Sequence, residues 1–172
     1  MSTRSAADLL LVVGPIASGK SSTAAGVAAQ LRERGHLVAL VGLDEVADSV
    51  ARADWAAAHQ VLGELTGAWL RQGATVVCEG PSTPDQVAEV TRWAPEGTRV
   101  VTVRLAIDLA AAHARAQTDP SRGISKDLAF LTRDHADHDA GVAGLAVDLV
   151  IDSGTTTLDE AVSQIVAVLN GD

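Results

Sequence analysis

The chain has 172 residues, 47% of them apolar, which fits one domain with a substantial core. Acidic residues outnumber basic ones by 22 to 13, and the net charge of -9 argues against general nucleic-acid binding, which requires a basic surface. No segment reaches the run of about 20 apolar residues that a membrane span requires, and the single cysteine, Cys78, lies in an apolar run typical of a buried thiol. We therefore expect a cytoplasmic protein without nucleic-acid or membrane partners.

Short apolar runs alternate along the chain with amphipathic stretches. Residues 9–13 are continuously apolar, as expected for a strand that is buried on both faces. Residues 20–34 then show the three- and four-residue apolar spacing of a helix. By the same patterns, the predicted strands are residues 9–13, 37–43, 74–78, 99–107 and 147–151, and the predicted helices are residues 20–34, 54–71, 84–94, 109–117, 127–138 and a last one after a capping pattern at 157–160.

This alternation predicts the fold class. Apolar strands separated by helices form a parallel sheet that is covered on both faces. Because crossover connections are right-handed, few topologies remain. We expect residues 1–172 to form a single α/β domain, a three-layer sandwich of five parallel strands with helices on both faces.

The first strand leads into a glycine-rich segment. It matches the phosphate-binding pattern G-x-x-x-x-G-K-[ST] over Gly14, Pro15, Ile16, Ala17, Ser18, Gly19, Lys20 and Ser21, with Ser22 following. Glycines let the backbone wrap around a phosphate, and the N–H groups at the start of the next helix face the anion. Lys20 is expected to contact the β- and γ-phosphates, and the Ser21 hydroxyl to bind Mg²⁺. The segment predicts binding of a nucleoside triphosphate.

Two further strands end in acidic residues. Asp44 follows the second strand and Glu79 follows the third, so both lie at the rim that carries the phosphate-binding loop. Asp44 is placed to orient or deprotonate a substrate hydroxyl, with capping of a helix over 45–52 as the alternative. Glu79 ends an apolar strand in the manner of a Mg²⁺-binding carboxylate. The alternative for Glu79 is a solvated strand end.

A polar segment over residues 118–126 interrupts the helical pattern. The basic residues in and around it are Arg115, Arg122, Lys126 and Arg133. Arginines that close over a γ-phosphate neutralise the transferring charge and exclude water. We predict a mobile lid over about residues 118–135, in which Arg122 stabilises the transferred group. Arg115, which precedes the lid, is expected to contact the nucleotide. Solvated ion pairs with neighbouring acids are the alternative.

Two other groups of residues receive a structural interpretation. His135 and His138 lie among aspartates, and one helical turn of this composition is more typical of a wet surface than of a metal site. Trp55 and Trp69 share a predicted helical stripe that is most simply core. The alternative for Trp55, near the start of its helix, is contact with a substrate.

With these segments in place, the chain resembles the chloramphenicol 3-O-phosphotransferase-like group of P-loop kinases, which is related to shikimate and gluconate kinases. The similar segments are the phosphate-binding loop, 41–44, 65–78 with the acid that follows, 148–152 and 155–161. The resemblance implies strand order 2-3-1-4-5, ATP and Mg²⁺ as cofactors, transfer to a hydroxyl, and Asp44 as catalytic base. It also implies that the loop carrying Gly154 and Thr155 passes near the adenine.

The expected function is ATP-dependent phosphorylation of a hydroxyl on a small metabolite or antibiotic. The sequence contains neither of the motifs, D-x-x-G and N-K-x-D, that signalling GTPases require. A nucleoside or nucleotide kinase is one alternative, and a non-catalytic regulatory nucleotide-binding module is another. The acceptor is not specified, because Glu79 stands where the resembled family commonly has aspartates.

Overall fold

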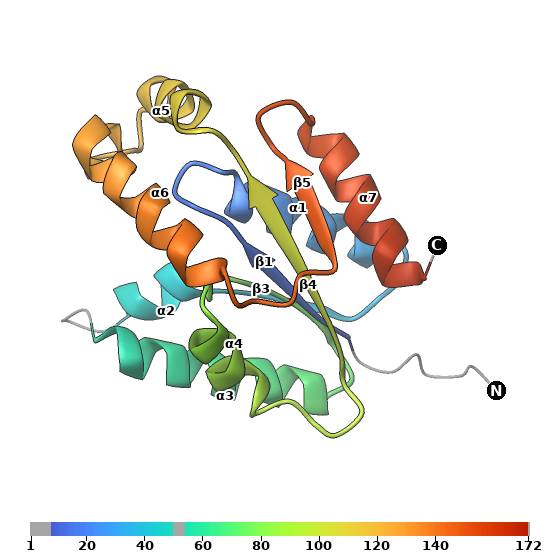
Figure 1. The fold of residues 1–172 in the computed structure, drawn as a ribbon. Helices are drawn as coiled ribbons and strands as arrows, with labels where there is room; N and C mark the ends of the chain where they lie inside the picture. Colours follow the sequence, from blue (N-terminus) through green and yellow to red (C-terminus); the bar gives the residue numbers. More distant parts are fainter. Residues whose placement is uncertain (1–7, 50–53, 172) are drawn as a thin grey trace.

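The computed structural model describes residues 8–49 and 54–171. Its elements in chain order are β1 (Asp8–Val13), α1 (Lys20–Glu33), β2 (Val38–Gly42), α2 (Leu43–Asp48), α3 (Trp55–Arg71), β3 (Thr75–Glu79), α4 (Pro84–Thr91), β4 (Arg99–Ala106), α5 (Leu109–Thr118), the 3₁₀-helix η1 (Ile124–Lys126), α6 (Leu128–Val142), β5 (Leu149–Asp152) and α7 (Leu158–Asn170). The strands form one sheet in the order β2-β3-β1-β4-β5, and every neighbouring pair is parallel. Helices lie on both faces (Figure 1). The predicted three-layer α/β fold and its strand order are confirmed.

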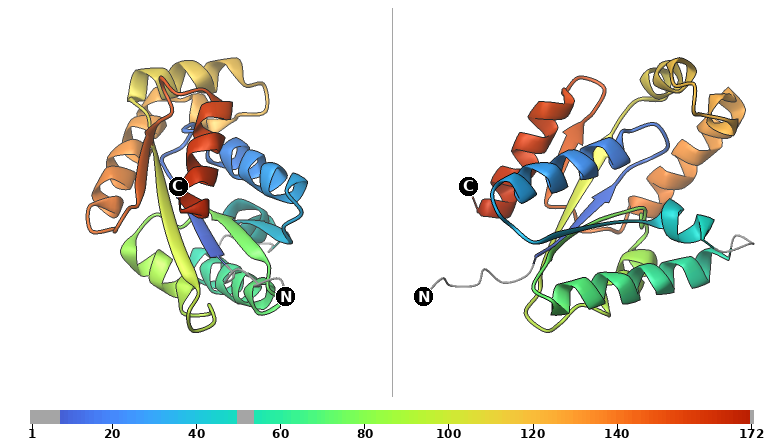
Figure 2. Two further views of the ribbon diagram at one scale, coloured as in Figure 1. Left: turned by 90° about the vertical axis from the view of Figure 1, so that its right-hand side faces the viewer. Right: turned by 180° about the vertical axis from the view of Figure 1, so that it is seen from behind.

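Alternate side chains of the central strand β1 belong to two separate halves of the core. Leu10 and Val12 pack with residues of α1 and α7, and Leu9 and Leu11 pack with residues of α3 and α4. All four side chains are fully buried. Figure 2 shows α1 and α7 together on one face of the sheet and α3 with α4 on the other. Burial on both faces explains why β1 reads as an unbroken apolar run.

The segment from α5 to α6 lies at the end of the sheet toward which the strands point (Figure 1). Ala112 and Ala116 of α5 and Leu131 of α6 form a small core cluster with Ala17 of the glycine-rich loop. This cluster holds α5 and α6 against that loop. The predicted lid, residues 118–135, corresponds to the end of α5, η1 and the first half of α6. Its mobility stays a prediction.

The interpretation of the tryptophan stripe on α3 as core is wrong. Trp55 and Trp69 are 51% and 45% exposed, respectively. The buried face of α3 instead contains Gly63 and Gly67, and a Cβ atom at Gly63 would lie 2.5 Å from Cδ1 of Trp93. Leu62 and Leu70 lie on this buried face with the glycines, which allow α3 to pack closely against Trp93. Trp55, Leu65 and Trp69 lie on the outer face.

Several element boundaries differ from those expected. α6 runs to Val142 and not to residue 138, and α4 ends at Thr91, three residues early. α2 begins at Leu43, directly after β2, and the end of the expected 45–52 helix lies outside the described residues.

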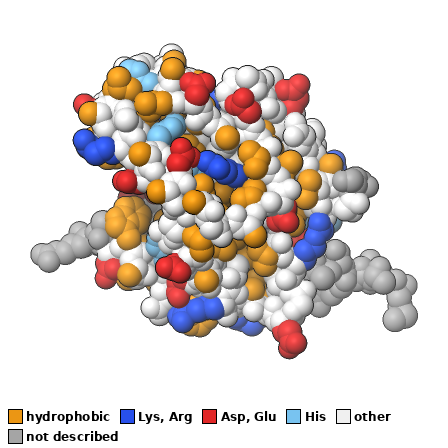
Figure 3. Space-filling model, in the orientation of Figure 1, with side chains coloured by type: hydrophobic (Ala, Val, Ile, Leu, Met, Phe, Trp, Pro, Cys, Tyr) orange, Lys and Arg blue, Asp and Glu red, His pale blue; other side chains and the backbone are white. Residues whose placement is uncertain are grey.

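None of the helices in the described ranges is both long enough and apolar enough to cross a membrane. On the face in Figure 3, Lys and Arg side chains form only small, separate groups.

Candidate functional site

The loop between β1 and α1 is tightly turned and closely packed. Gly19 has a φ angle of 90° and is the N-cap of α1, and Ala17 has a φ of 65°. A Cβ atom at Gly14 would lie 2.6 Å from Ser18 Oγ and 2.8 Å from the Leu105 carbonyl oxygen, so the position requires glycine. No side chain caps α1 among the described residues. The first N–H groups of α1 are therefore free to bind an anion.

Lys20 and Glu79 are two half-buried charges next to this loop. Lys20 Nζ donates a hydrogen bond to the Pro15 carbonyl oxygen at 2.9 Å, and the Ser21 hydroxyl donates one to Glu79 Oε1 at 2.9 Å. Burial lowers the pKa of Lys20, and the charge of Glu79 opposes this shift. Burial raises the pKa of Glu79, and the hydrogen bond from Ser21 opposes it. Both groups lose hydration here, so binding of a triphosphate and its metal would compensate both charges.

Ser21 and Glu79 fit a magnesium ion in their chemistry. Both present oxygen atoms, the ligand type that Mg²⁺ prefers, and the hydrogen bond of 2.9 Å between the Ser21 hydroxyl and Glu79 Oε1 places them side by side. Over residues 8–49 and 54–171, no cluster of three or more His, Cys, Asp or Glu side chains is arranged to hold a metal ion. A Mg²⁺ at Ser21 and Glu79 would therefore draw its other ligands from phosphates and water, which is its usual mode with nucleotides.

Asp44 is an exposed residue in the first turn of α2. The N-cap position of α2 is held by Gly42 and not by Asp44, so the structure gives no support to a capping role for Asp44. Gly42 pairs with Glu79 across the parallel β2 and β3 strands. Asp44 and Glu79 therefore emerge at the same rim of the sheet, as the strand pattern predicted.

Two adjoining cavities occupy this rim. The small cavity, of about 150 Å³, is lined by Ile16, Ala17, Gly19, Lys20, Ser21, Ser22, Asp44, Glu79 and Arg122. The large cavity, of about 630 Å³, is lined by Gly14, Pro15, Ile16, Lys20, Leu43, Asp44, Trp55, His59, Glu79, Gly80, Ser82, Thr83, Gln86, Phe130, Asp134, Asp137 and His138. Lys20, Asp44 and Glu79 line both. Residues predicted from four separate segments thus meet at the small cavity.

The two arginines selected from the sequence have different positions. Arg122 lines the small cavity, where its Nε donates to Asp119 Oδ2 at 3.2 Å. Arg115 donates to the Ala17 carbonyl oxygen at 3.0 Å and to the Ser153 carbonyl oxygen at 2.7 Å. Arg115 therefore ties the phosphate-binding loop to the connection between β5 and α7, and its contact with nucleotide stays a prediction.

The connection between β5 and α7 also carries Gly154 and Thr155. Neither residue lines the small or the large cavity. The Gly154 N–H donates to Asp152 Oδ1 at 2.9 Å, which fixes the turn after β5. The implied contact of this connection with adenine stays a prediction.

The interpretation of the histidine-rich turn of α6 as wet surface is wrong for His138. His138 is only 7% exposed, and its Nε2 is buried without a hydrogen-bond partner among the described residues. Asp134 Oδ2 accepts a hydrogen bond from the Ile16 N–H at 2.9 Å, and His135 Nε2 donates to the Ile16 carbonyl oxygen at 3.2 Å. α6 is thus fastened to the phosphate-binding loop. The seven- and four-residue spacing of Leu131, His138 and Val142, all buried, is the sequence signal for this face.

We expect His138 to make the fold less stable in mild acid. Burial, together with the positive charge of Arg104, lowers the pKa of His138 to about 4, whereas an unfolded histidine titrates near pH 6.5. Between these values the unfolded chain binds a proton that the folded chain does not, so stability falls as the pH falls. Urea unfolding should show a loss of about 1–2 kcal/mol between about pH 7 and pH 5 that is missing in His138→Gln. Equal losses in both proteins would contradict this assignment.

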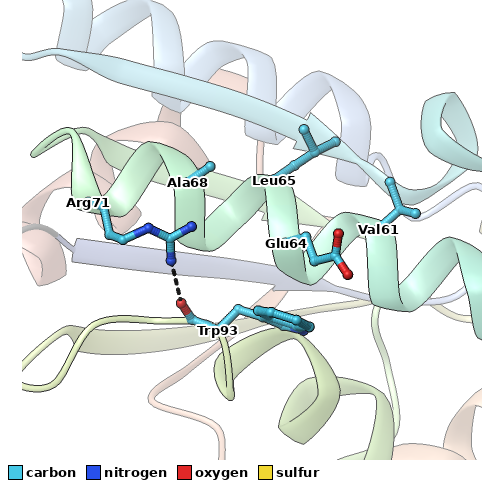
Figure 4. A pocket seen from close by; sticks show the side chains of 6 residues that line it. All are labelled: Val61, Glu64, Leu65, Ala68, Arg71 and Trp93. Carbon is cyan, nitrogen blue, oxygen red and sulfur yellow. Dashed lines mark hydrogen bonds between the residues drawn. The ribbon is translucent and has the colours of Figure 1, made fainter.

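A further hollow, of about 570 Å³, lies on the outer side of α3 and is lined by Val61, Glu64, Leu65, Ala68, Arg71 and Trp93 (Figure 4). Arg71 Nη1 donates to the Trp93 carbonyl oxygen across it at 3.4 Å. It shares no lining residue with the two cavities at the rim. This hollow is therefore separate from the residues that the sequence predicts for the site.

Comparisons with known proteins identify the fold. No protein-family model and no curated protein matches the sequence. Among solved structures, the APS kinase of Mycobacterium tuberculosis in complex with AMPPNP and APS has a TM-score of 0.71 and 18% identity, over 95% of this chain and 98% of that chain. An unliganded sugar kinase from Janibacter sp. HTCC2649 has a TM-score of 0.68 and 16% identity, over 95% of each chain. At these identities the similarity shows the fold alone, and this chain has the fold that these two kinases share.

Proposed function

We propose that this protein is a cytoplasmic ATP-dependent kinase that transfers the γ-phosphoryl group to a hydroxyl of a small metabolite or antibiotic. The observation that carries the proposal is the small cavity, where the phosphate-binding loop meets Asp44, Glu79 and Arg122. Each of these groups can supply one part that phosphoryl transfer requires. The adjoining large cavity, at about 630 Å³, is within the size range of small-ligand sites.

The proposed roles follow from the position of each group. Lys20 and the N–H groups at the start of α1 hold the triphosphate, and Ser21 and Glu79 are the residues that would hold Mg²⁺. When bound, Mg²⁺ neutralises charge on the phosphates. These residues orient the γ-phosphate toward the large cavity, where the acceptor would lie.

Asp44 lines both cavities, so it can contact an acceptor hydroxyl that lies beside the γ-phosphate. It accepts the hydroxyl proton as the acceptor oxygen forms its bond to phosphorus. The bond between the γ-phosphorus and the bridging oxygen of ADP breaks in the same displacement. Asp44 is exposed, so an acceptor that enters the large cavity can reach its side chain.

The test is a panel of hydroxylated acceptors incubated with ATP labelled in its γ-phosphoryl group. We expect at least one small alcohol or sugar in the panel to become labelled, and ADP formation to depend on its presence. Labelling of nucleosides or nucleotides alone would favour the nucleoside- or nucleotide-kinase alternative. ATP binding without acceptor-dependent ADP would favour a regulatory module.

Arg122→Ala is expected to lower kcat by about 10²–10³, the usual effect of removing one donor to a transition-state anion. In the structure Arg122 is paired with Asp119, and a surface pair of this kind is worth only about 0.2–1 kcal/mol. Release of Arg122 toward a phosphate therefore costs little. Steady-state kinetics should show a nearly unchanged KM for ATP, since the contact strengthens as charge develops. The exposed Arg133, which lines neither cavity, provides the control, and an equal kcat loss in Arg133→Ala would contradict a specific role for Arg122.

A further inference from the structure

We propose that the acceptor carries a positively charged amine near the hydroxyl that is phosphorylated, as an amino alcohol or amino sugar does. The inference rests on the proposed function and specifies its substrate class. It comes from the charges and rings that line the large cavity.

The first observation is the charge balance of the large cavity. At its phosphate end, Lys20 and Glu79 are assigned to the triphosphate and Mg²⁺. The remaining charged lining residues are Asp44, Asp134 and Asp137, all acidic, and no described arginine lines this cavity. A carboxylate, phosphate or sulfate on the acceptor would be repelled here by charges of the same sign.

The second observation is that, among the described residues, none of these carboxylates lies within ion-pairing distance of a cation. Asp44 and Asp134 are nevertheless near enough to Lys20 for their charges to oppose the lowering of its pKa by burial. The ion pairs among the described residues are Arg92–Glu89, Arg104–Asp139 and Arg122–Asp119, and none includes a carboxylate of the large cavity. Asp134 accepts one hydrogen bond, from the Ile16 N–H. The charges of Asp134 and Asp137 are thus available to a ligand in addition to that of Asp44, the proposed base. An ammonium group, with three donors, can contact more than one of them.

The third observation is aromatic. Trp55, at the start of α3, and Phe130, on α6, line the same cavity as the carboxylates. Trp55 is 51% exposed, although a tryptophan of a helical stripe is usually packed in a core. Aromatic faces attract cations through the negative potential above the ring, most strongly for tryptophan. Carboxylates and aromatic rings together favour an ammonium group over a neutral sugar.

Two buried histidines also line this cavity. His59 and His138 are each 7% exposed, and the Nε2 atom of each is buried without a hydrogen-bond partner in the described part of the chain. His59 Nδ1 lies 2.6 Å from the Trp55 carbonyl oxygen, which can only accept, so Nδ1 carries the proton. In the neutral ring, Nε2 of His59 is then a hydrogen-bond acceptor. An N–H or O–H of the ligand would satisfy it after a small side-chain movement.

Matched acceptors separate the charge of the ligand from its shape. We use two sets of three compounds, each with an amine, a neutral and an acid member. One trio is aminopropanediol, glycerol and glycerate, and the other is glucosamine, glucose and glucuronate. Binding of each compound is measured by calorimetry on the wild-type protein saturated with Mg²⁺ and AMPPNP, and transfer is measured with labelled ATP. We expect the amine member of a trio to bind at least about tenfold more tightly than its neutral member, and the acid member to bind most weakly.

Variants then locate the charge recognition. Asp137→Asn should weaken amine binding by about three- to tenfold and leave binding of the neutral member unchanged. Trp55→Leu should weaken amine binding by a similar factor, and Trp55→Phe should restore most of it, since phenylalanine keeps an aromatic face. Glu33→Gln removes one negative charge at the exposed far end of α1 and is the matched control, expected to bind amines as wild type does.

The outcomes distinguish this inference from the proposed function. If the protein binds AMPPNP and phosphorylates or binds neutral or acidic members better than amines, the inference is wrong and the kinase proposal stands. If AMPPNP binds but no amine of either trio binds, the inference is also wrong. If AMPPNP itself does not bind, the proposed function fails first, and the inference fails with it.

Discussion

Lys20→Ala is expected to weaken binding of Mg²⁺·ATP by about 10- to 100-fold. A hydrogen bond to a charged group contributes about 1.5–3 kcal/mol, and each 1.4 kcal/mol is a factor of ten in affinity. Lys20 lines both cavities and lies next to the loop that would hold the phosphates. Burial already lowers the pKa of this ammonium group, so bound phosphate would restore a favourable environment for its charge.

The chain offers a matched control for this variant. Its other lysine, Lys126, ends η1 and lines neither cavity. Lys126→Ala removes the same charge and should leave the affinity for Mg²⁺·ATP close to that of wild type. If calorimetry gives Lys20→Ala and Lys126→Ala the same affinity for Mg²⁺·ATP as wild type, the nucleotide does not bind at the phosphate-binding loop.

Asp44→Asn is expected to lower kcat by about 10²–10⁴, the usual cost of losing a general base. Asparagine keeps the size of the side chain and some hydrogen bonding, but it cannot take the hydroxyl proton. ATP affinity should stay nearly unchanged, because the loop and Lys20 hold the phosphates. Glu45→Gln, an exposed change at the next residue, is the control and should keep nearly full activity.

Affinity for the metal separates the two roles open to Asp44. Loss of a Mg²⁺ ligand would weaken Mg²⁺·ATP binding, whereas loss of a base would not. If Asp44→Asn keeps a third or more of the wild-type kcat, both roles fail. Glu79, which lines both cavities as well, would then be the next candidate for the base.

The local features of the site were predictable from the sequence. Gly14 to Ser21 are contiguous, and their pattern follows directly from what a backbone needs in order to surround a phosphate. Asp44 and Glu79 could be placed at one rim because the carboxyl ends of parallel strands meet there. The pairing of Gly42 with Glu79 bears out this placement. The chemical roles of these residues remain predictions.

Features that depend on how helices rotate were not predictable in this way. On α3 the apolar stripe that includes Trp69 was favoured, but Gly63 and Gly67 face inward because they permit close contact with Trp93. On α6, the polar composition hid the buried position of His138 and the contact of Asp134 with Ile16. Composition describes a helix as a whole, whereas the packing of its neighbours decides which face is buried.

The central claim is that the rim transfers the γ-phosphoryl group of ATP to an acceptor hydroxyl. Its most direct test is mass spectrometry of the reaction of wild-type protein with an acceptor and ATP labelled with heavy oxygen in its γ-phosphoryl group. The account predicts a phosphorylated acceptor whose three non-bridging phosphoryl oxygens all carry the label, with one ADP formed for each product. Release of ADP and labelled inorganic phosphate, with every acceptor unchanged, would contradict it.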